Sequence, residues 1–417
     1  MMVKKKEATT ILHTIFSRKM VVALFMGFSC GVPLMLTLSV LQAWMKQEGV
    51  DLSVIGAMSL VGIPYTIKFL WAPILDRFTL PFLGRRRGWL LLIQIALMFT
   101  IAAMALLHPA RNPMWVAIAA LIVAFFSASQ DIVVDAYRRE DLTDAELGLG
   151  SALYVNGYRF GLLIVSGGGL ILADRIGFSA VYLVMSLCMI PGILTTAKTP
   201  EPPLIQGAPS TMKEAVWLPL KDFFSRNGAM AILAFILLYK IGDTMATAMT
   251  VPFFLDIGFT NSEIGTIVKL FGFWAIVAGA FLGGVILLRI GIYQGLWLFG
   301  IFQAVSTAGL MILASVGYSV SFLAMVIIGE NLASGMGTSA YTAFMASMTN
   351  RRFTATQYAL LSSIMGVPRV LLAAPTGWIA QNVGWMGFFG LCMLLAVPGL
   401  LLLLRFKTWQ TASETTS

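Results

Sequence analysis

The sequence predicts an all-α polytopic membrane protein, with twelve transmembrane helices in two halves of six. Of its 417 residues 58% are hydrophobic and 11% are charged, and the mean hydropathy is +0.86. A soluble domain is about a quarter charged, so this chain has too little polar surface to cover itself in water. Apolar stretches recur along the chain, and a single long polar segment interrupts them near its middle. The composition excludes a soluble enzyme, a nucleic-acid-binding domain, a disulfide scaffold and a disordered chain.

A helix needs about 20 apolar residues to cross the hydrocarbon core of a membrane. The first such stretch runs uncharged from Met20 to Met45, which is too long for a cleaved signal peptide, so we interpret it as a retained helix. Charges and turn-forming residues separate the others. The predicted spans are 20–45, 52–75, 89–107, 113–134, 148–173, 178–197, 229–255, 262–288, 291–314, 317–346, 356–379 and 385–405.

Basic residues gather in the loops on one side of the predicted membrane. Twenty Lys and Arg lie on that side, against three on the other, which are Lys46, Arg111 and Arg175. Loops rich in Lys and Arg stay in the cytoplasm. We therefore expect both termini, residues 1–19 and 406–417, to be cytoplasmic, and the net charge of +9 to reflect topology and not nucleic-acid binding.

The polar segment 198–228 is predicted to be a cytoplasmic linker between an N-terminal half, residues 20–197, and a C-terminal half, residues 229–405. Short matches between the halves recur at a nearly constant offset, for example Ala173–Gly177 with Ala380–Gly384 and Arg159 with Arg369. Two parallel halves of six helices are the layout of the major facilitator superfamily, in which the substrate site lies between the repeats.

Charged residues inside the predicted spans are informative, because each disfavours insertion by a few kcal/mol unless it faces protein or a wet cavity. Cations outnumber carboxylates among them, which predicts a cavity for an anion that carries carboxylate or phosphate. A structural alternative is internal ion pairing, most plausibly Lys240 with Asp243 at i, i+3. The candidate substrate-binding residues are Gln42, Trp44, Lys68, Gln130, Asn156, Arg159, Lys240, Lys269, Asn331 and Arg369.

The loop after the second span, from Asp76 to Gly88, is similar to the signature loop of the superfamily, which latches the cytoplasmic side. The candidate gate residues are Asp76, Arg77, Arg85, Arg86 and Arg87. Two features depart from the pattern, since Ala72 replaces an expected Gly and the loop is several residues longer. The alternative interpretation is a basic loop that only sets topology.

A closer resemblance covers residues 20–405 and both halves. The chain resembles the AmpG family of muropeptide permeases in the strings Leu41–Met45, Lys68–Pro73, Gly84–Trp89, Ser127–Val133, Leu238–Asp243, Glu330–Leu332, Gly335–Ala340 and Ala355–Leu361. The resemblance implies import of 1,6-anhydromuropeptides from periplasm to cytoplasm for peptidoglycan recycling, across the bacterial inner membrane. It also implies coupling to the proton as the driving ion, with no other cofactor and no enzymatic activity. We expect a monomer in lipid, and the alternative substrate is another anion such as an acyl-nucleotide or siderophore.

A proton-coupled transporter needs a group that takes up and releases the proton. Neither histidine, His13 or His108, lies in a predicted span, and neither has partners spaced as metal ligands. Burial favours the protonated form of a carboxyl group, so the candidates for proton coupling are Asp131, Glu330 and Asp243. Lys240 is expected to hold Asp243 ionised, and Glu330 precedes a stretch of small residues. Asp131 has no cation within four residues on its own helix and is the first choice.

Overall fold

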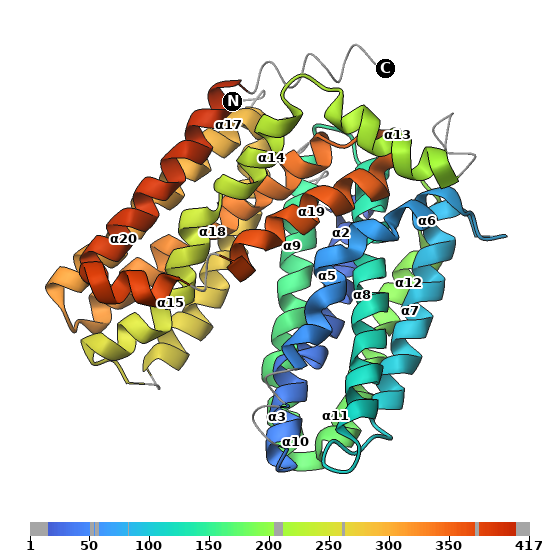
Figure 1. Ribbon diagram of the computed structural model, residues 1–417, viewed down its shortest axis with the longest axis horizontal. Coiled ribbons are helices and arrows are strands. Elements are labelled where there is room, and N and C mark those ends of the chain that lie inside the picture. Colours follow the sequence, from blue (N-terminus) through green and yellow to red (C-terminus); the bar gives the residue numbers. More distant parts are fainter. Residues whose placement is uncertain are drawn as a thin grey trace. The chain divides into compact units, whose positions relative to one another are not determined.

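The computed structural model describes residues 16–50, 54, 58–81, 83–203, 212–260, 263–371 and 375–405. In these ranges the backbone is helical apart from turns and one isolated bridge between Leu80 and Gly84. The chain divides into two compact units, which Figure 1 shows as ribbons. Unit 1 takes residues up to Thr143, with Leu153–Pro219 and Arg351–Leu360; unit 2 takes Asp144–Ala152, Leu220–Asn350 and the residues from Leu361 on. The prediction of an all-α polytopic protein is confirmed.

Nine helical stretches of the described chain are long and apolar enough to cross a membrane. They are Arg18–Gln47, Arg85–Met104, Pro113–Asp141, Leu147–Ile176, Phe178–Lys198, Ala229–Ile257, Thr266–Val316, Val320–Ser347 and Thr376–Arg405. The 51-residue stretch turns at Gly291, whose φ of 76° is non-helical, at the boundary predicted between spans 262–288 and 291–314. The total of twelve spans stays a prediction.

Unit 1 contains the helices of the N-terminal half. Their bounds are α2 Arg18–Thr37, α3 Ser39–Gln47, η1 Met58–Gly62, α5 Ile63–Ile67, η2 Lys68–Leu70, α6 Ala72–Arg77, α7 Arg85–Met104, α8 Pro113–Asp141, α9 Leu147–Leu163, η3 Ile164–Gly168, α10 Gly169–Ile176, α11 Phe178–Leu187 and α12 Ile190–Lys198. The first residues of α9 are assigned to unit 2. Pro113 is the first residue of α8, a position whose backbone N–H has no partner within the helix, so proline removes no hydrogen bond there. Gly177 turns the chain between α10 and α11 with a φ of 76°.

The second predicted span is not one continuous helix. Residues 58–77 form the short pieces η1, α5, η2 and α6. Pro64 and Pro73 lie in the first turns of α5 and α6, where proline is tolerated, whereas inside a longer helix each would remove a backbone hydrogen bond. The breaks place Lys68, which is 6% exposed, at the start of η2.

Two helices extend further than predicted. α7 begins at Arg85 instead of residue 89, and α8 continues to Asp141 instead of ending at residue 134. Arg85, Arg86 and Arg138 are therefore buried in helices, and the prediction that they lie in loops is wrong. Hydropathy ends a span at the first charges, but here acidic partners allow the charged helix ends to be buried.

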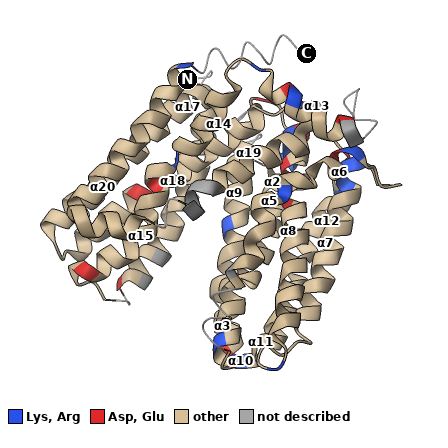
Figure 2. Cartoon of the chain, viewed as in Figure 1, with Lys and Arg blue, Asp and Glu red and all other residues tan. Residues whose placement is uncertain are grey.

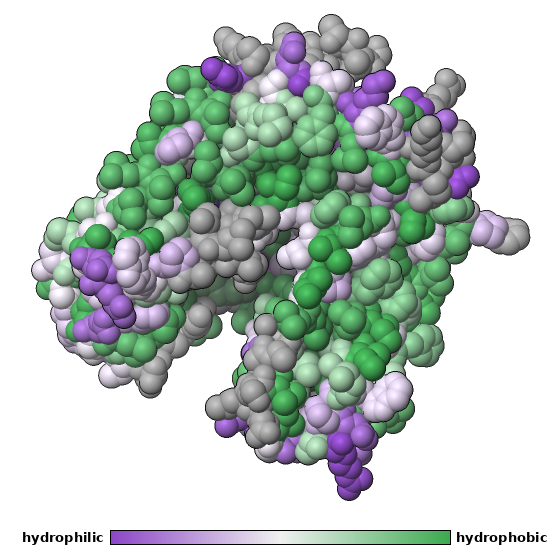
Figure 3. All heavy atoms as spheres, viewed as in Figure 1, coloured by the Kyte–Doolittle hydropathy of each residue, from purple (hydrophilic) through white to green (hydrophobic). Residues whose placement is uncertain are grey.

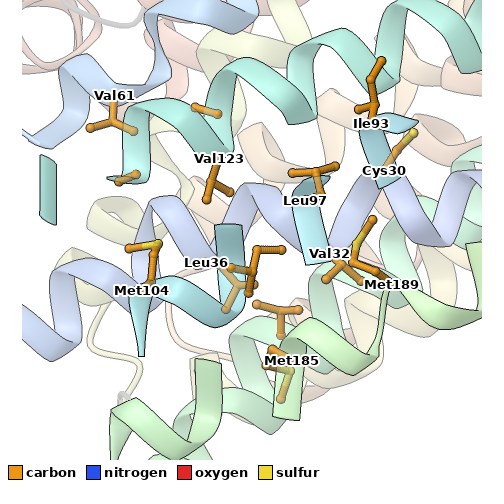
Figure 4. Close-up of a cluster of buried hydrophobic side chains, with 14 of the residues drawn as sticks. Cys30, Val32, Leu36, Val61, Ile93, Leu97, Met104, Val123, Met185 and Met189 are labelled. Carbon is orange, nitrogen blue, oxygen red and sulfur yellow. The ribbon is translucent and has the colours of Figure 1, made fainter. Parts of the chain in front are cut away.

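The core of unit 1 is apolar and sulfur-rich (Figure 4). Leu36 from α2, Leu97 from α7, Val123 from α8 and Met185 from α11 pack in it. Charged residues of unit 1 gather near α6 and near α3 and α10, at opposite ends of its helices (Figure 2). The visible flank between those ends is mainly apolar (Figure 3), as expected of a surface that faces lipid.

α2 and α9 approach each other closely through glycines. Gly27 and Gly31 on α2 lie against the backbone of Tyr154 and Tyr158, and Gly157 on α9 lies against the backbone of Leu24 and Phe28. Small residues spaced by four let helices in a membrane pack backbone to backbone. A side chain at any of these positions would meet main-chain atoms, which cannot move aside alone.

Unit 2 contains the helices of the C-terminal half. Their bounds are α14 Ala229–Leu238, α15 Ile241–Ile257, η4 Ile264–Phe271, α17 Gly272–Val316, α18 Val320–Ser347 and α20 Thr376–Leu402, and the second part of α19 Thr354–Leu371 is also assigned to this unit. Its core is aromatic, with Phe253 and Phe254 of α15 against Phe388 and Phe389 of α20. The linker also holds a helix that the sequence analysis did not predict, α13 Met212–Phe224.

The close α2–α9 packing gives a prediction about stability. Gly157→Ala should lower the free energy of unfolding by about 1–3 kcal/mol, because its methyl group would overlap the backbone of α2. Gly329→Ala on α18 is the matched control, since a methyl group there meets no described atom within 4 Å. Thermal unfolding in detergent checks this. Equal midpoints for the two variants would contradict the packing.

Candidate functional site

The two charged residues of unit 1 that are fully buried among the described residues, Asp76 and Arg86, belong to one compact group. We call it the Arg86 cluster: Asp76, Arg85, Arg86, Glu140, Thr354 and Thr356. Arg86 is fully buried and its guanidinium contacts two carboxylates, Asp76 Oδ1 at 2.7 Å and Glu140 Oε1 at 2.6 Å. Arg85 pairs with the same Glu140 oxygen at 3.0 Å. Two cations thus face two carboxylates, and a charge-balanced group tolerates burial far better than an isolated ion.

The Arg86 cluster fixes the first turn of α19. Asp76 accepts hydrogen bonds from the backbone N–H of Thr356 at 2.8 Å and from its hydroxyl at 2.7 Å. The Thr354 hydroxyl donates to Glu140 and accepts from Arg86 Nη2 at 3.2 Å. A carboxylate at a helix N-terminus satisfies free N–H groups and complements the helix dipole. Asp76 therefore serves as the N-terminal cap of a helix about 280 residues away in sequence.

The remaining predicted gate residues have separate contacts. Arg87 donates to the carbonyl oxygens of Thr196 and Ala197 near the end of α12, at 3.3 and 2.8 Å. Its backbone N–H, and that of Arg86, are capped by the carboxylate of Glu201 at 2.9 and 2.7 Å. The Arg77 guanidinium lies 4.8 Å from the centre of the Phe78 ring. Of the predicted gate residues, the structure thus brings Asp76, Arg85 and Arg86 into one cluster.

A second group in unit 1, the Asp131 cluster, contains Lys68, Asp131, Asp135, Arg138, Tyr154 and Tyr358. Asp131 and Asp135 lie one turn apart on α8, and the charge of Lys68 acts on both carboxylates. Arg138 binds Asp135 at 3.0 Å and donates to the Tyr358 hydroxyl at 2.8 Å. Its guanidinium also lies 4.3 Å from the centre of the Tyr154 ring, a favourable cation–π distance.

Asp131 differs from Asp135 in its contacts. The Oδ1 atom of Asp131 is buried and accepts no hydrogen bond from the described residues, whereas Asp135 is held by Arg138. No cation lies within four residues of Asp131 on α8, but Lys68 on η2 supplies a positive charge from another helix. Asp131 therefore has a positive charge nearby together with an oxygen that is open to a proton.

In unit 2 the Lys240 cluster consists of Lys240, Asp243, Ser334, Thr338 and Glu330. The predicted ion pair is confirmed, with Lys240 Nζ 3.1 Å from Asp243 Oδ2. Lys240 also donates to the Thr338 hydroxyl at 2.9 Å, so the pair is fixed to α18. Glu330 also lies on α18 and is 7% exposed. The negative charge of Asp243 is close enough to act on its carboxyl group.

Two other predicted site residues, Gln130 and Trp44, are packed among side chains of unit 1. Gln130 is fully buried between α8 and α2, with Ser29 Oγ at 3.3 Å and Cys30 Sγ at 3.2 Å. Trp44 is 3% exposed and its ring stacks on Phe178, at a centroid distance of 6.1 Å. Roles for these two residues in substrate contact stay predictions.

The polar residues Gln42, Asn156, Arg159 and Asn331 lie on α3, α9 and α18. Asn156 is 4% exposed, and its side-chain oxygen accepts no hydrogen bond within the described chain. Asn331 donates to the Ile327 carbonyl oxygen of its own helix at 2.9 Å. Gln42 and Arg159 are half-buried. The side chains of Lys269 and Arg369 lie outside the described residues.

Sequence reasoning missed Glu140, Arg138 and Tyr358. Glu140 and Arg138 follow residue 134, the predicted end of the fourth span, and hydropathy alone places charged residues beyond that end in a loop. One available signal was the apolar loop between Asp76 and Arg85, which leaves a run of three arginines without enough nearby acids. Tyr358 carries no charge, and no local pattern predicts that it reaches Arg138, which is 220 residues away.

Comparison with known proteins identifies the class. Residues 20–373 match the Major Facilitator Superfamily. The fold is similar to the Escherichia coli fucose:proton symporter FucP, with a TM-score of 0.72 at 14% identity over 94% of this chain and 98% of that one. The proton:xylose symporter XylE is similar with a TM-score of 0.71 at 11% identity, over 95% and 96% of the two chains. The protein is a multi-pass membrane transporter of this superfamily.

Sequence relatives narrow the class. The chain is 44% identical to the anhydromuropeptide permease of Escherichia coli K12, over 92% of this chain and 78% of that protein. It is 31% identical to the putative transporter AmpG 4 of Rickettsia conorii, over 92% and 95% of the two chains. The chain belongs to the AmpG family of permeases, which confirms the family expected from its sequence.

The Arg86 cluster gives a prediction about stability. Arg86→Gln should lower the free energy of unfolding by about 3–5 kcal/mol, because two buried carboxylates would then face Arg85 alone. Arg111→Gln, at an exposed arginine in the turn before α8, should change it by less than about 1 kcal/mol. Tryptophan fluorescence during denaturant unfolding measures both. If the two variants lost similar free energies of unfolding, the buried ion pairs of Arg86 would contribute nothing to stability.

Proposed function

We propose that the protein imports 1,6-anhydromuropeptides from periplasm to cytoplasm, driven by protons, for the recycling of peptidoglycan. The observation that carries this proposal is the 44% identity, over 92% of the chain, to a protein named as an anhydromuropeptide permease. The excess of Lys and Arg in the loops and helix ends on one side of the predicted membrane supports cytoplasmic termini in a bacterial inner membrane.

The candidate substrate contacts are cations in the helices of both units. Anhydromuropeptides carry carboxylates on their peptides, and Lys68 and Lys240 are cations placed beside polar side chains within the described part of each unit. A charged group in a shielded site attracts its partner more strongly than in water. Asn156 offers an unpartnered amide oxygen that suits a sugar hydroxyl or a peptide N–H.

Asp131 is our candidate for the coupling proton. Its Oδ1 atom has no hydrogen-bond donor in the described chain, whereas the Asp243 carboxylate is paired with Lys240 at 3.1 Å. Glu330 is the second candidate. In this proposal the Arg86 cluster acts as the cytoplasmic gate, because opening would have to separate the first turn of α19 from Asp76 and Glu140.

The experiment that tests the proposed function is uptake of labelled anhydromuropeptide into membrane vesicles. Accumulation should require an inward proton gradient, and excess unlabelled anhydromuropeptide should abolish it. Strong competition by an unrelated anion, such as an acyl-nucleotide or siderophore, together with no competition by the muropeptide, would assign the transporter to another substrate.

Charge recognition gives a third prediction. Lys68→Gln and Lys240→Gln should each reduce the uptake of peptide-bearing substrate by about tenfold, which corresponds to about 1.4 kcal/mol. Uptake of the same compound with its carboxylates amidated should fall much less. The control is Lys46→Gln, at an exposed lysine near the end of α3. Equal losses for both substrates would show that these lysines support the fold and do not recognise the anion.

Proton coupling gives a fourth prediction. Asp131→Asn should abolish accumulation driven by a pH gradient, because an amide cannot bind and release the proton, while exchange of labelled for unlabelled substrate persists. Asp174→Asn, at an exposed carboxylate on α10, should accumulate substrate normally. Accumulation by Asp131→Asn in response to an imposed pH gradient would move the assignment to Glu330 or Asp243.

A further inference from the structure

The linker helix α13 exposes large apolar side chains (Figure 1 gives its position in the chain). Trp217 is 61% exposed, Phe224 51% and Val216 43%. These are high values for a helix in a segment that is otherwise polar. A contiguous apolar surface of this kind marks an interaction site.

The exposed residues lie on one side of α13. At 100° per residue, Val216, Trp217, Lys221 and Phe224 fall within one face, while the buried residues Ala215, Pro219 and Phe223 fall on the opposite side. Lys221 is exposed at one edge of this face, one turn after Trp217. The face therefore combines aromatic and aliphatic groups with a positive charge.

Asp222, the acidic residue near the C-terminal end of α13, is turned away from the exposed face. Asp222 pairs with Arg226 and accepts a hydrogen bond from Asn350 Nδ2 at 3.2 Å. Its negative charge is therefore satisfied within unit 2 and does not neutralise the exposed face. Glu214, the other acid of α13 whose side chain the structure describes, is partly exposed two turns before Lys221. At the Lys221 end the exposed face is apolar and cationic, which suits a membrane surface, with apolar acyl chains beneath anionic headgroups.

The chain confines α13 to the neighbourhood of a membrane surface. It follows α12, whose stretch Phe178–Lys198 is apolar enough to span, and only residues 225–228 separate it from α14, which opens the spanning stretch Ala229–Ile257. The stretch Phe178–Lys198 ends, and the stretch Ala229–Ile257 begins, on the same side of the membrane, because the chain leaves the membrane after the first and enters it again at the second. Such a short connection keeps Phe224 close to the lipid headgroups.

We propose that α13 lies along the membrane surface as an interfacial amphipathic helix that recognises anionic phospholipid. Trp217, Phe224 and Val216 enter the boundary between headgroups and acyl chains, where tryptophan is favoured. Lys221 faces the phosphate groups and gives the helix a preference for anionic over zwitterionic lipid. This inference does not depend on the identity of the transported solute.

Collision measurements on a spin label test the location of the face. Labels are placed at Trp217→Cys and Phe224→Cys in a Cys188→Ala background, since the other cysteines, Cys30 and Cys392, are 1% exposed. Ser225→Cys is the matched control, because Ser225 is an exposed polar residue next to Phe224. Only protein that elutes as a single species in gel filtration is reconstituted, into nanodiscs with a quarter of the lipid as phosphatidylglycerol.

At positions 217 and 224 we expect oxygen to collide with the label several-fold more than a water-soluble nickel complex does, and the reverse at position 225. Access of the nickel complex to all three positions would show that the face is in water. Exclusion of both reagents from positions 217 and 224 would show that protein covers the face. Either result would overturn the proposal.

The preference for anionic lipid is tested separately. In the Phe224→Cys protein, the ratio of oxygen to nickel collisions should rise when phosphatidylglycerol is added to phosphatidylcholine. With the additional change Lys221→Gln, that rise should disappear. A rise of the same size in both proteins would remove the role assigned to Lys221, and no rise in either would remove anionic-lipid recognition altogether.

Discussion

The pairing of Arg86 with Asp76 and Glu140 is the interaction on which the arrangement of unit 1 depends. Arg86 is fully buried, and removing an ion from water is unfavourable by several kcal/mol unless opposite charges and hydrogen bonds replace the water. Its guanidinium reaches both carboxylates, the Leu75 carbonyl oxygen and the Thr354 hydroxyl. The partners come from α6, α8 and α19, so this one side chain of α7 joins four helices at one end of the unit.

The same constraint explains which charges remain available for function. The Arg86 cluster contains two cations and two carboxylates, and Asp135 holds Arg138 nearby. In unit 2, Lys240 is shared between Asp243 and a threonine. Asp131 keeps one buried oxygen without a described donor. The Arg86 cluster, whose charged groups bind one another, suits a structural and gating role, whereas the incompletely bonded carboxylate of Asp131 suits reversible protonation.

Much of the fold could be predicted from the sequence because lipid imposes length and apolarity on each span. The Lys240–Asp243 pair was also predictable, since i, i+3 neighbours must face each other on a helix. The Arg86 cluster was only partly predictable. Asp76, Arg85 and Arg86 are close in sequence, but Glu140 and Thr354 reach them only through tertiary packing. Hydropathy likewise ended α8 too early, because it assigns every charge to water and cannot recognise a buried pair.

A double-mutant cycle between Asp76→Asn and Thr356→Ala tests most directly whether the buried charges fix α19. The free energy of unfolding is measured for the parent protein, both single variants and the double variant in the same detergent. Because the Asp76 carboxylate accepts the Thr356 hydroxyl at 2.7 Å, the losses should be non-additive by about 0.5–3 kcal/mol. Strictly additive losses would contradict the account, since they would mean that Asp76 and the start of α19 do not interact.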